Sequence, residues 1–411
     1  MAMIFLLVAL QISGVFSKSL QIPENYMALR TVAGHINKFS SDFYDAVSIG
    51  ERGNLIASPI SASMALSMLT YGARGNTEKQ LKSVLHLNGD VNVQKRGVKT
   101  LIETLNEFSR VELKLASKIF ISQNVTVRPE FQEIAKSVFK SASQKVDYAK
   151  PEEACKIIND WCEQQTNSKI KDLFSPDDLD SDTALVLANA VYFKGNWMHK
   201  FNKSLTILKN FTLEDGTVRE VPTMHAYRDY RFGILEDLGA SFVELPYESN
   251  DISDDISMFI ILPNDRSGLK DLEKNLTKLD LNLLLAGSMS EVSLTLPKFK
   301  VASKLDLKAP LLDLGLKDIF EESADLSGIT SGDSTSLKVS KIVQKAFIEV
   351  NEDGSEAAAA TGIEATAFSA PIPIDFHVDR PFYYAIVKHL GREEGGILLF
   401  SGYYRDVEDW N

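Results

Sequence analysis

The chain has 411 residues, of which 44% are hydrophobic and 24% charged, and its formal net charge is -12. This composition is that of a globular protein with a large core. The acidic balance argues against general nucleic-acid binding, because a polyanion is repelled by a negative surface. Lys95, Arg96 and Lys99 form the one candidate basic cluster, and we interpret it as a solvated helix face. We therefore expect neither a nucleic-acid partner nor a polyanion cofactor.

The first seventeen residues, MAMIFLLVALQISGVFS, predict a signal peptide spanning residues 1–17. An apolar run from Ile4 to Leu10 leads into small residues, with Val15 and Ser17 at the positions that a signal peptidase reads. The absence of Lys or Arg near the start departs from the usual pattern. The run is shorter than the roughly 20 residues that span a bilayer. We expect a secreted, extracellular protein that is not held in a membrane.

Four glycosylation sequons agree with a secretory route. They begin at Asn124, Asn202, Asn210 and Asn275. Any one of them could occur by chance, so only the set supports the prediction of a glycoprotein.

Early in the chain, apolar residues at helical spacing predict helices over residues 39–49 and 61–71. Ser58 and Pro59 offer an N-cap and a first-turn proline for the second helix. A further helix start is predicted by the sequence Thr77-Glu78-Lys79-Gln80, which has the pattern of a capping box.

Later in the chain, the pattern changes to alternation or to short apolar runs, as in TALVLANAVYF, ISMFIILP, EVSLTLPKF and ILLFSGYY. Helices early and strands late indicate the α+β class rather than alternating βαβ units.

The two cysteines, Cys155 and Cys162, both fall in PEEACKIINDWCEQQ, which is typical of a helix. Two helical turns would separate their Cα atoms by about 10.5 Å, beyond the roughly 7 Å that a disulfide can bridge. We predict two free thiols on one buried face.

A search for catalytic or metal-binding patterns finds none of the common ones. The six histidines are scattered, and the chain has no H-E-x-x-H, G-x-S-x-G, Walker or G-x-G-x-x-G motif. The histidines are His35, His86, His199, His225, His377 and His389. We expect a protein that is not an enzyme and needs no metal or cofactor, while a hydrolase with a triad assembled from distant residues stays the alternative.

Several long segments, in chain order, resemble the serpin family. They include NLIASPISASMALSMLTYGARGNTEKQL, LANAVYFKGNW, LDLKAPLLDLGLKDIF, IVQKAFIEVNEDGSEAAAAT and RPFYYAIV. The resemblance implies a single domain over residues 18–411 with three β-sheets, about nine helices and an exposed reactive-centre loop. It also implies a secreted inhibitor that traps a serine protease, and it places the hinge and reactive-centre loop at about residues 351–378.

The composition of that loop suits insertion as a strand. Alternate residues of a strand point to opposite faces, and the odd-numbered set from Ser355 to Ala367 is small or apolar, while Glu356 and Glu364 fall in the even set. A register slip of one residue would bury both glutamates. The hinge implied by the resemblance consists of Glu352, Gly354, Ser355, Glu356, Ala357, Ala358, Ala359, Ala360 and Thr361.

The family's usual spacing from Gly354 places the cleaved bond between Phe368 and Ser369. No Lys or Arg occurs between Ser355 and Asp379, which disfavours a trypsin-like enzyme because its acidic pocket needs a cation. We predict a chymotrypsin-like target, with an elastase-like enzyme cutting after Ala367 as the alternative. Loop lengths vary in the family, so the bond could lie a residue or two away.

The resemblance further implies a polar cluster under the point where the central sheet opens. Ser58, Ser61 and Asn189 match it, and Gln344 stands where the family usually has histidine. Glutamine does not titrate, so we predict little pH dependence of sheet opening near neutrality from this site. Trp197 matches the aromatic residue at the top of the sheet, where insertion begins.

Two other functions are compatible with the same fold. A non-inhibitory serpin would act as a carrier, storage protein or chaperone, and the small residues at Ser355, Ala357 and Ala359 disfavour it. A loop that is cleaved without trapping would make the chain an ordinary substrate. We expect the protein to be a monomer.

Overall fold

The computed structural model describes residues 23–49, 53–108, 110–250, 255–331, 337–354, 373–391 and 395–407. The predicted signal peptide lies outside these ranges. Within them there are nine α-helices, in agreement with the expected number. They are α2 (Glu24–Ser48), α3 (Pro59–Gly72), α4 (Gly75–Val84), α5 (Val91–Asn106), α6 (Pro129–Ser137), α7 (Pro151–Gln165), α8 (Leu269–Lys274), α9 (Leu281–Leu285) and α10 (Lys308–Asp313). No helix among the described residues is both long and apolar enough to cross a membrane.

The predicted start of the second helix is right in place, but Ser58 does not cap it. Ser58 does precede α3, with Pro59 in its first turn, yet the Ser58 hydroxyl does not cap the helix and donates instead to the Leu399 carbonyl oxygen at 2.8 Å. The α2 helix begins at Glu24, well before the predicted residue 39, because helically spaced residues such as Leu29 and Val32 are also buried.

The predicted capping box at Thr77 is wrong. Helix α4 begins two residues earlier, at Gly75, with no side-chain cap. The Thr77 hydroxyl accepts from the Asp325 N–H at 3.0 Å, and the Gln80 side-chain Oε1 accepts from the Lys317 N–H at 2.8 Å. Both side chains therefore fasten α4 to a segment some 240 residues away in sequence, a use that local pattern does not reveal.

The strands of the described residues form two hydrogen-bonded sheets, where the resemblance implies three. The larger has nine strands, in the order β1-β14-β13-β8-β7-β6-β9-β12 with β5 paired to β6. Strand β6 joins what would otherwise be two sheets, because its first residues pair with β5 and its last with β7. These strands are β1 (Leu55–Ala57), β5 (Ile207–Thr212), β6 (Val218–Leu235), β7 (Ala240–Pro246), β8 (Ile256–Pro263), β9 (Ser288–Pro297), β12 (Ile374–His377), β13 (Phe382–His389) and β14 (Gly396–Tyr404).

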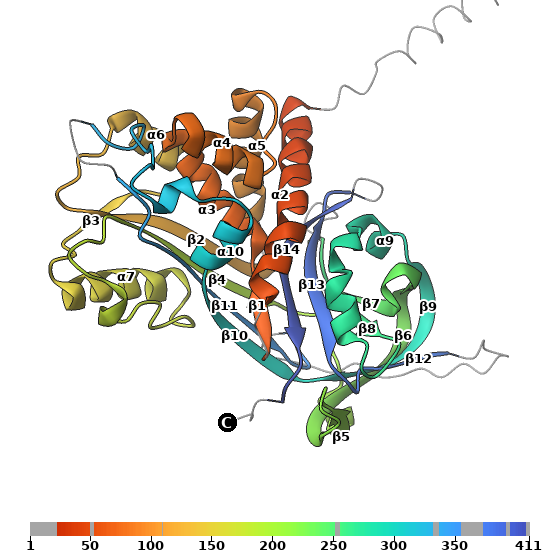
Figure 1. Ribbon diagram of the computed structural model, residues 1–411. Coiled ribbons are helices and arrows are strands. Elements are labelled where there is room, and N and C mark those ends of the chain that lie inside the picture. Colours follow the sequence, from red (N-terminus) through yellow and green to blue (C-terminus); the bar gives the residue numbers. More distant parts are fainter. Residues whose placement is uncertain are drawn as a thin grey trace, which may run out of the picture.

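The smaller sheet has five strands and contains the candidate site. Its order is β10-β11-β4-β2-β3, and Figure 1 shows α7 on one side of it, with α3 and α10 on the other. The strands are β2 (Val111–Ser122), β3 (Gln144–Val146), β4 (Leu185–Gly195), β10 (Phe299–Asp306) and β11 (Lys341–Val350). The α+β class is confirmed.

Each face of the five-stranded sheet covers a separate apolar cluster, as alternation along a strand requires. Ile342, Ala346 and Ile348 of β11 belong to the main core, whereas Val343 belongs to a second cluster on the other face. Helix α7 fills that second cluster with Cys155, Ile158 and Cys162 among others.

The cysteine prediction is confirmed. Cys155 and Cys162 are both buried and free on α7. Burial raises the pKa of the Cys162 thiol to about 12, and it also raises the pKa of Cys155.

Candidate functional site: the seam between β4 and β11 and its hinge

The central sheet contains a parallel seam between β4 and β11, two strands that are about 150 residues apart in sequence. Their ladder runs from Lys341 opposite Val186 to Phe347 opposite Tyr192. Both strands continue for three more residues, to Val350 and Gly195, without pairing across this gap. Since β4 and β11 are parallel, a strand antiparallel to both could enter between them and pair with each.

The structure brings together the four predicted residues beneath this seam. Gln344 and Asn189 lie opposite each other in the ladder, and the Gln344 Nε2 donates to Asn189 Oδ1 at 2.8 Å. Gln344 also exchanges two bonds with the Ser58 backbone, donating to its carbonyl oxygen at 3.0 Å and accepting from its N–H at 2.8 Å. The Asn189 Nδ2 donates to the Ser61 hydroxyl at 2.6 Å. The cluster therefore joins β4 and β11 to the start of α3.

Ser117 of β2 completes this cluster and was not predicted. Its hydroxyl accepts from the Asn189 Nδ2 at 2.7 Å, and it lies opposite Asn189 in the antiparallel ladder. The alternation in VELKLASKIFIS places Ser117 on the core-facing side, between apolar neighbours, which is the signal that could have identified it.

Gln344 is fully buried and uses both amide hydrogens and its carbonyl oxygen. Such a network is stable because each buried polar group has a partner. None of its side chains carries a group that titrates near neutral pH, and the small pH dependence of sheet opening stays a prediction.

Trp197 lies at the top of the seam and not in the polar cluster. Its ring stacks on Tyr247, with centroids 4.5 Å apart, and its Nε1 donates to the Asn351 carbonyl oxygen at 2.9 Å. The Trp197 backbone N–H donates to the Asp353 carbonyl oxygen at 3.0 Å. Trp197 thus binds the first residues that follow β11.

Those residues form a turn that reverses the chain over the open end of the seam. The Gly354 N–H donates to the Asn351 carbonyl oxygen at 3.2 Å, and Gly354 has φ of +90°. A Cβ at this position would lie 2.4 Å from the Gly195 carbonyl oxygen and 2.5 Å from the Trp197 nitrogen. Both the positive φ and the close approach require glycine here.

Glu352 anchors the same turn through a buried ion pair. Its carboxylate lies 2.9 Å from Lys298 Nζ and accepts from the Thr206 hydroxyl at 2.8 Å. Burial by itself raises the pKa of Glu352, but the Lys298 and Thr206 hydrogen bonds and a backbone N–H outweigh it, so the pKa lies below its ordinary value. Asp353, next in the chain, lies 2.6 Å from Lys203 Nζ.

The structure describes only part of the predicted hinge and loop. Glu352 and Gly354 are within it, whereas Ser355 to Thr361, Phe368 and Ser369 lie outside the described residues.

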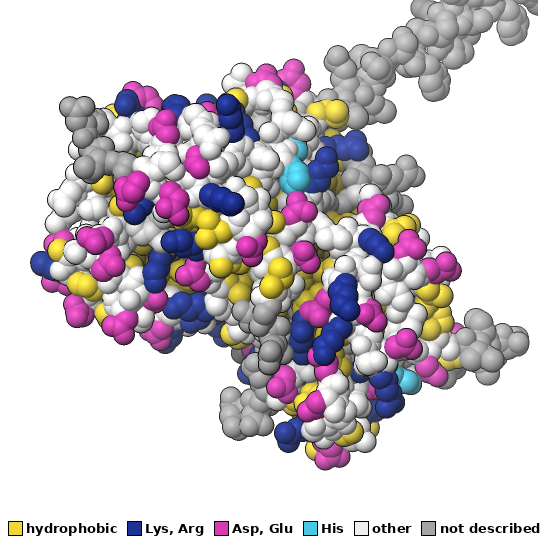
Figure 2. Space-filling view, in the orientation of Figure 1, with side chains coloured by type: hydrophobic (Ala, Val, Ile, Leu, Met, Phe, Trp, Pro, Cys, Tyr) yellow, Lys and Arg dark blue, Asp and Glu magenta, His cyan; other side chains and the backbone are white. Residues whose placement is uncertain are grey.

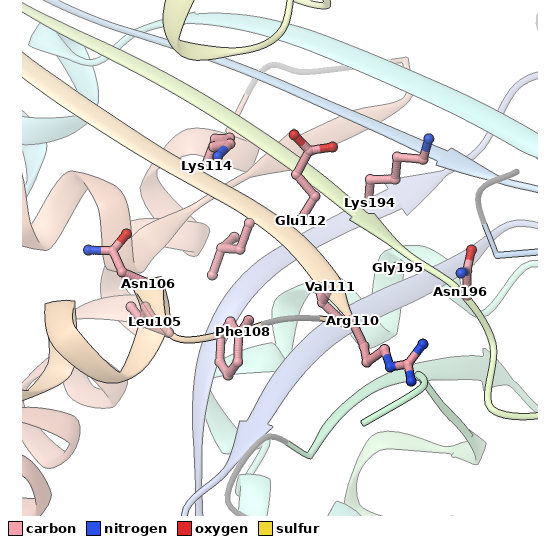
Figure 3. Close-up of a pocket in the computed structure, with 11 residues that line it drawn as sticks. Leu105, Asn106, Phe108, Arg110, Val111, Glu112, Lys114, Lys194, Gly195 and Asn196 are labelled. Atoms are coloured by element: carbon pink, nitrogen blue, oxygen red, sulfur yellow. The ribbon is translucent and has the colours of Figure 1, made fainter. Parts of the chain in front are cut away.

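A surface pocket of about 400 Å³ adjoins the top of the seam. Figure 3 shows Lys114, Glu112 and Lys194 along its sheet side and Arg110 at its end, and Gly195 and Asn196 lead from it directly to Trp197. Its lining is mainly polar and charged. Among the described residues, no group of three or more His, Cys, Asp or Glu side chains is placed to hold a metal ion.

The four sequon asparagines all reach the surface. Asn124, Asn202 and Asn210 are exposed, and Asn275 is half-buried, its amide donating to the Asp271 carbonyl oxygen at 2.7 Å. Acidic and basic side chains lie interspersed over the face seen in Figure 2.

Comparison with known proteins agrees with the geometry of the seam. Residues 34–406 match the family described as "Serpin (serine protease inhibitor)". The chain is 38% identical over 385 residues to Iris of Ixodes ricinus, covering 92% of this chain and 99% of Iris. It is 34% identical over 378 residues to Antitrypsin of Bombyx mori, covering 90% and 93% of the two chains.

Among solved structures, Serpin48 of the insect Tenebrio molitor is similar to this protein. It gives a TM-score of 0.81 at 35% sequence identity, covering 92% of this chain and 98% of the other. Sequence, fold and the arrangement around the seam agree, and the chain belongs to the serpin family of serine protease inhibitors.

Proposed function

We propose that this protein is a secreted suicide substrate that traps a chymotrypsin-like serine protease after cleavage between Phe368 and Ser369. The observation that supports this most directly is the turn at Asn351–Gly354, which reverses the chain at the open end of the β4–β11 seam. We infer that the residues after Gly354 can enter the seam antiparallel to β11, because a turn of this kind joins antiparallel strands.

The register of β11 supports the prediction that the odd-numbered side chains of an inserted strand enter the core. Its even-numbered residues point into the main core. If residues 351–354 stay as the turn, Ser355 faces Val350, and paired residues of antiparallel strands point to the same side. The odd-numbered residues from Ser355 to Ala367 then enter the core face, and Glu356 and Glu364 stay on the other face.

The chemistry consists of an interrupted acyl transfer. The protease serine oxygen attacks the Phe368 carbonyl, the bond to Ser369 breaks, and the released amine takes the proton. The protease remains joined to Phe368 as an ester. About 14 inserted residues at roughly 3.3 Å each carry it some 46 Å, and loss of a single oxyanion-hole donor slows deacylation by about 10² to 10³.

The target class follows from the loop rather than from the relatives. The relative named Antitrypsin carries a trypsin target in its name, but this chain has no Lys or Arg from Ser355 to Asp379. Phe368 suits an apolar pocket. An elastase-like enzyme cutting after Ala367 is the alternative target.

We also propose a single domain over residues 18–411, glycosylation at the four sequons, an extracellular location and a monomeric state. The surface exposure of Asn124, Asn202 and Asn210 supports glycosylation at these positions.

A matched pair of variants tests trapping against simple cleavage. Ala357→Arg places a charge on the face predicted to enter the core, so the protease should cleave the loop and leave without a stable adduct. Ala358→Arg places the same charge on the outer face and should keep adduct formation. Equal adduct yields from the two variants would contradict insertion in this register.

A further inference from the structure

The segment between α7 and β4, residues 166–184, lies across the outer face of the seam. Its buried apolar side chains pack in one cluster with residues from both strands that flank the seam. The segment contributes Ile170, Leu173, Phe174 and Leu179, β4 contributes Val186, Ala188 and Ala190, and β11 contributes Val343. A strand that enters between β4 and β11 must therefore pass beneath this segment.

The segment is fixed on the side of α7 and β4. The side chain of Asn159 of α7 forms two hydrogen bonds with the Phe174 backbone. It donates to the carbonyl oxygen at 2.8 Å and accepts from the N–H at 2.9 Å. The Cys155 thiol donates to the same carbonyl oxygen at 2.8 Å. Most of the buried residues that share this cluster with the segment belong to α7 and β4, whereas β11 contributes only Val343. We therefore expect this segment to move with β4 when the seam opens.

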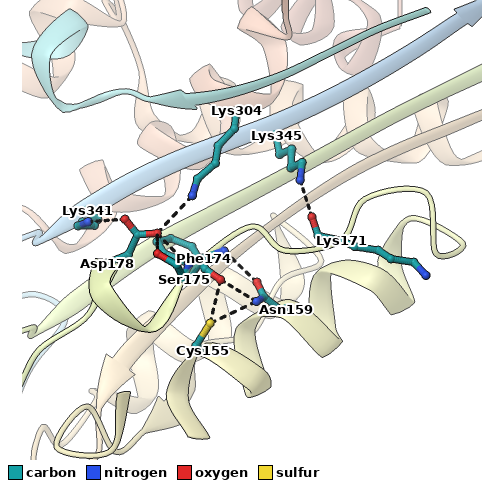
Figure 4. Close-up of polar contacts among 9 residues, drawn as sticks. All are labelled: Cys155, Asn159, Lys171, Phe174, Ser175, Asp178, Lys304, Lys341 and Lys345. Carbon is teal, nitrogen blue, oxygen red and sulfur yellow. Dashed lines mark hydrogen bonds and ion pairs between the residues drawn. The ribbon is translucent and has the colours of Figure 1, made fainter. Parts of the chain in front are cut away.

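On the far side of the seam, the segment is tied by charge. Asp178 lies 3.0 Å from Lys341 Nζ of β11 and 3.2 Å from Lys304 Nζ of β10 (Figure 4). Lys345 of β11 donates to the Lys171 carbonyl oxygen at 2.5 Å. The Asp178 carboxylate is held in place by the N–H and hydroxyl of Ser175, each at 2.9 Å.

These hydrogen bonds keep the Asp178 carboxylate ionised. Burial by itself raises the pKa of Asp178, but the bonds from Ser175, Lys341 and Lys304 outweigh it and hold the pKa well below its ordinary value.

We propose that Asp178, by tying β10 and β11 to the segment anchored on α7 and β4, limits the rate at which the seam opens and so sets the partition between trapping and simple cleavage. This inference rests on the proposed function. A new strand moves β11 away from β4 by about 4.8 Å, which breaks contacts of 3.0 and 3.2 Å. The shared lysine contacts must be lost before insertion is complete.

The expected change in the rate of seam opening depends on how exposed Asp178 and its two lysine partners are to solvent. The side chains of Asp178, Lys341 and Lys304 keep 26%, 29% and 42% of their surface, so solvent and salt weaken the tie. Removing it should accelerate opening about threefold to tenfold. The acceleration should shrink in 1 M NaCl.

The test measures opening with and without a protease. The probe is a synthetic peptide with the sequence of residues 355–368, whose rate of incorporation into the intact protein reports seam opening. The number of inhibitor molecules consumed per chymotrypsin trapped reports the partition. The variants are Asp178→Asn, which removes the contacts to both lysines, Lys341→Gln, which removes one of them and leaves the Lys304 contact, and their double mutant. Lys300→Gln is the matched control, because Lys300 of β10 pairs with Glu349 of β11 at 4.0 Å, on one side of the seam.

We expect both single variants to take up peptide faster than wild type and to consume fewer molecules per protease trapped. The effect of Lys341→Gln should be smaller than that of Asp178→Asn, because the Lys304 contact remains. The double mutant should match Asp178→Asn, and Lys300→Gln should match wild type. Unchanged peptide uptake in both single variants, with a wild type that traps chymotrypsin, would overturn the role of Asp178. A wild type that neither takes up peptide nor forms an adduct would overturn the proposed function itself.

Discussion

At the scale of single residues, the polar cluster beneath the seam and the hinge above it are held by different chemistry. The core face has the neutral amide pair of Gln344 and Asn189, whereas the hinge above it depends on the charged pair of Glu352 and Lys298. Of these two pairs, only the second contains a carboxylate, whose charge is lost on protonation. The two sites should therefore respond differently to acid.

Glu352→Gln should weaken the native state at neutral pH but not in acid. It removes a buried charge that pairs with Lys298, so we expect a loss of about 2 kcal/mol at pH 7, read from urea unfolding midpoints. The folded-state pKa of Glu352 is lowered from its ordinary 4.5, so its contribution is full above that value and is lost as pH falls through the folded pKa. A difference between wild type and variant that stays constant from pH 7 to pH 3 would argue against the ion pair.

Gln344→Ala should destabilise the native state by about 3 kcal/mol, because it leaves buried partners on Ser58 and Asn189 without hydrogen bonds. Denaturant unfolding measures this loss. For the wild type we expect a trapping rate that is flat between pH 6 and 8. A fall of the kind a histidine causes, present in wild type and absent in Gln344→Ala, would contradict our interpretation of this position.

At the scale of elements, apolar periodicity predicted where helices and strands lie. It did not predict side-chain contacts between residues that are distant in sequence. The helix around Cys155 and Cys162 and the strand through Asn189 follow their apolar patterns closely. The capping prediction at Thr77 failed because that hydroxyl binds the Asp325 N–H, far away in sequence. The contacts of Asp178 were equally out of reach, since its partners lie about 125 and 165 residues further along the chain.

The packing of α7 gives a prediction for its thiols. Because burial raises the pKa of both cysteines, the native protein at pH 8 should react with a thiol reagent far more slowly than the unfolded chain. Counting labelled thiols by mass spectrometry, with and without urea, checks this. Labelling of either cysteine within minutes in the absence of urea would show that α7 does not cover them.

At the scale of the whole molecule, the fold combines a large apolar core with a parallel seam whose two strands are unpaired with each other only over their last three residues. The serpin resemblance identified the cluster of Ser58, Ser61, Asn189 and Gln344 before any coordinates, and the structure confirms that these residues meet. The resemblance did not identify Ser117 or the contacts of Asp178, because neither residue lies in the segments that carried it. In the proposed insertion, an added strand would exchange the single ladder between β4 and β11 for two ladders, one with each strand.

The central claim is that cleavage and trapping are one event at the bond between Phe368 and Ser369. The most direct measurement mixes the protein with chymotrypsin at near-equal amounts, separates the products by denaturing electrophoresis, and determines the mass of the released C-terminal peptide. We predict a detergent-stable adduct together with a peptide that begins at Ser369. Cleavage at that bond with no adduct, or with chymotrypsin recovered fully active, would contradict the account.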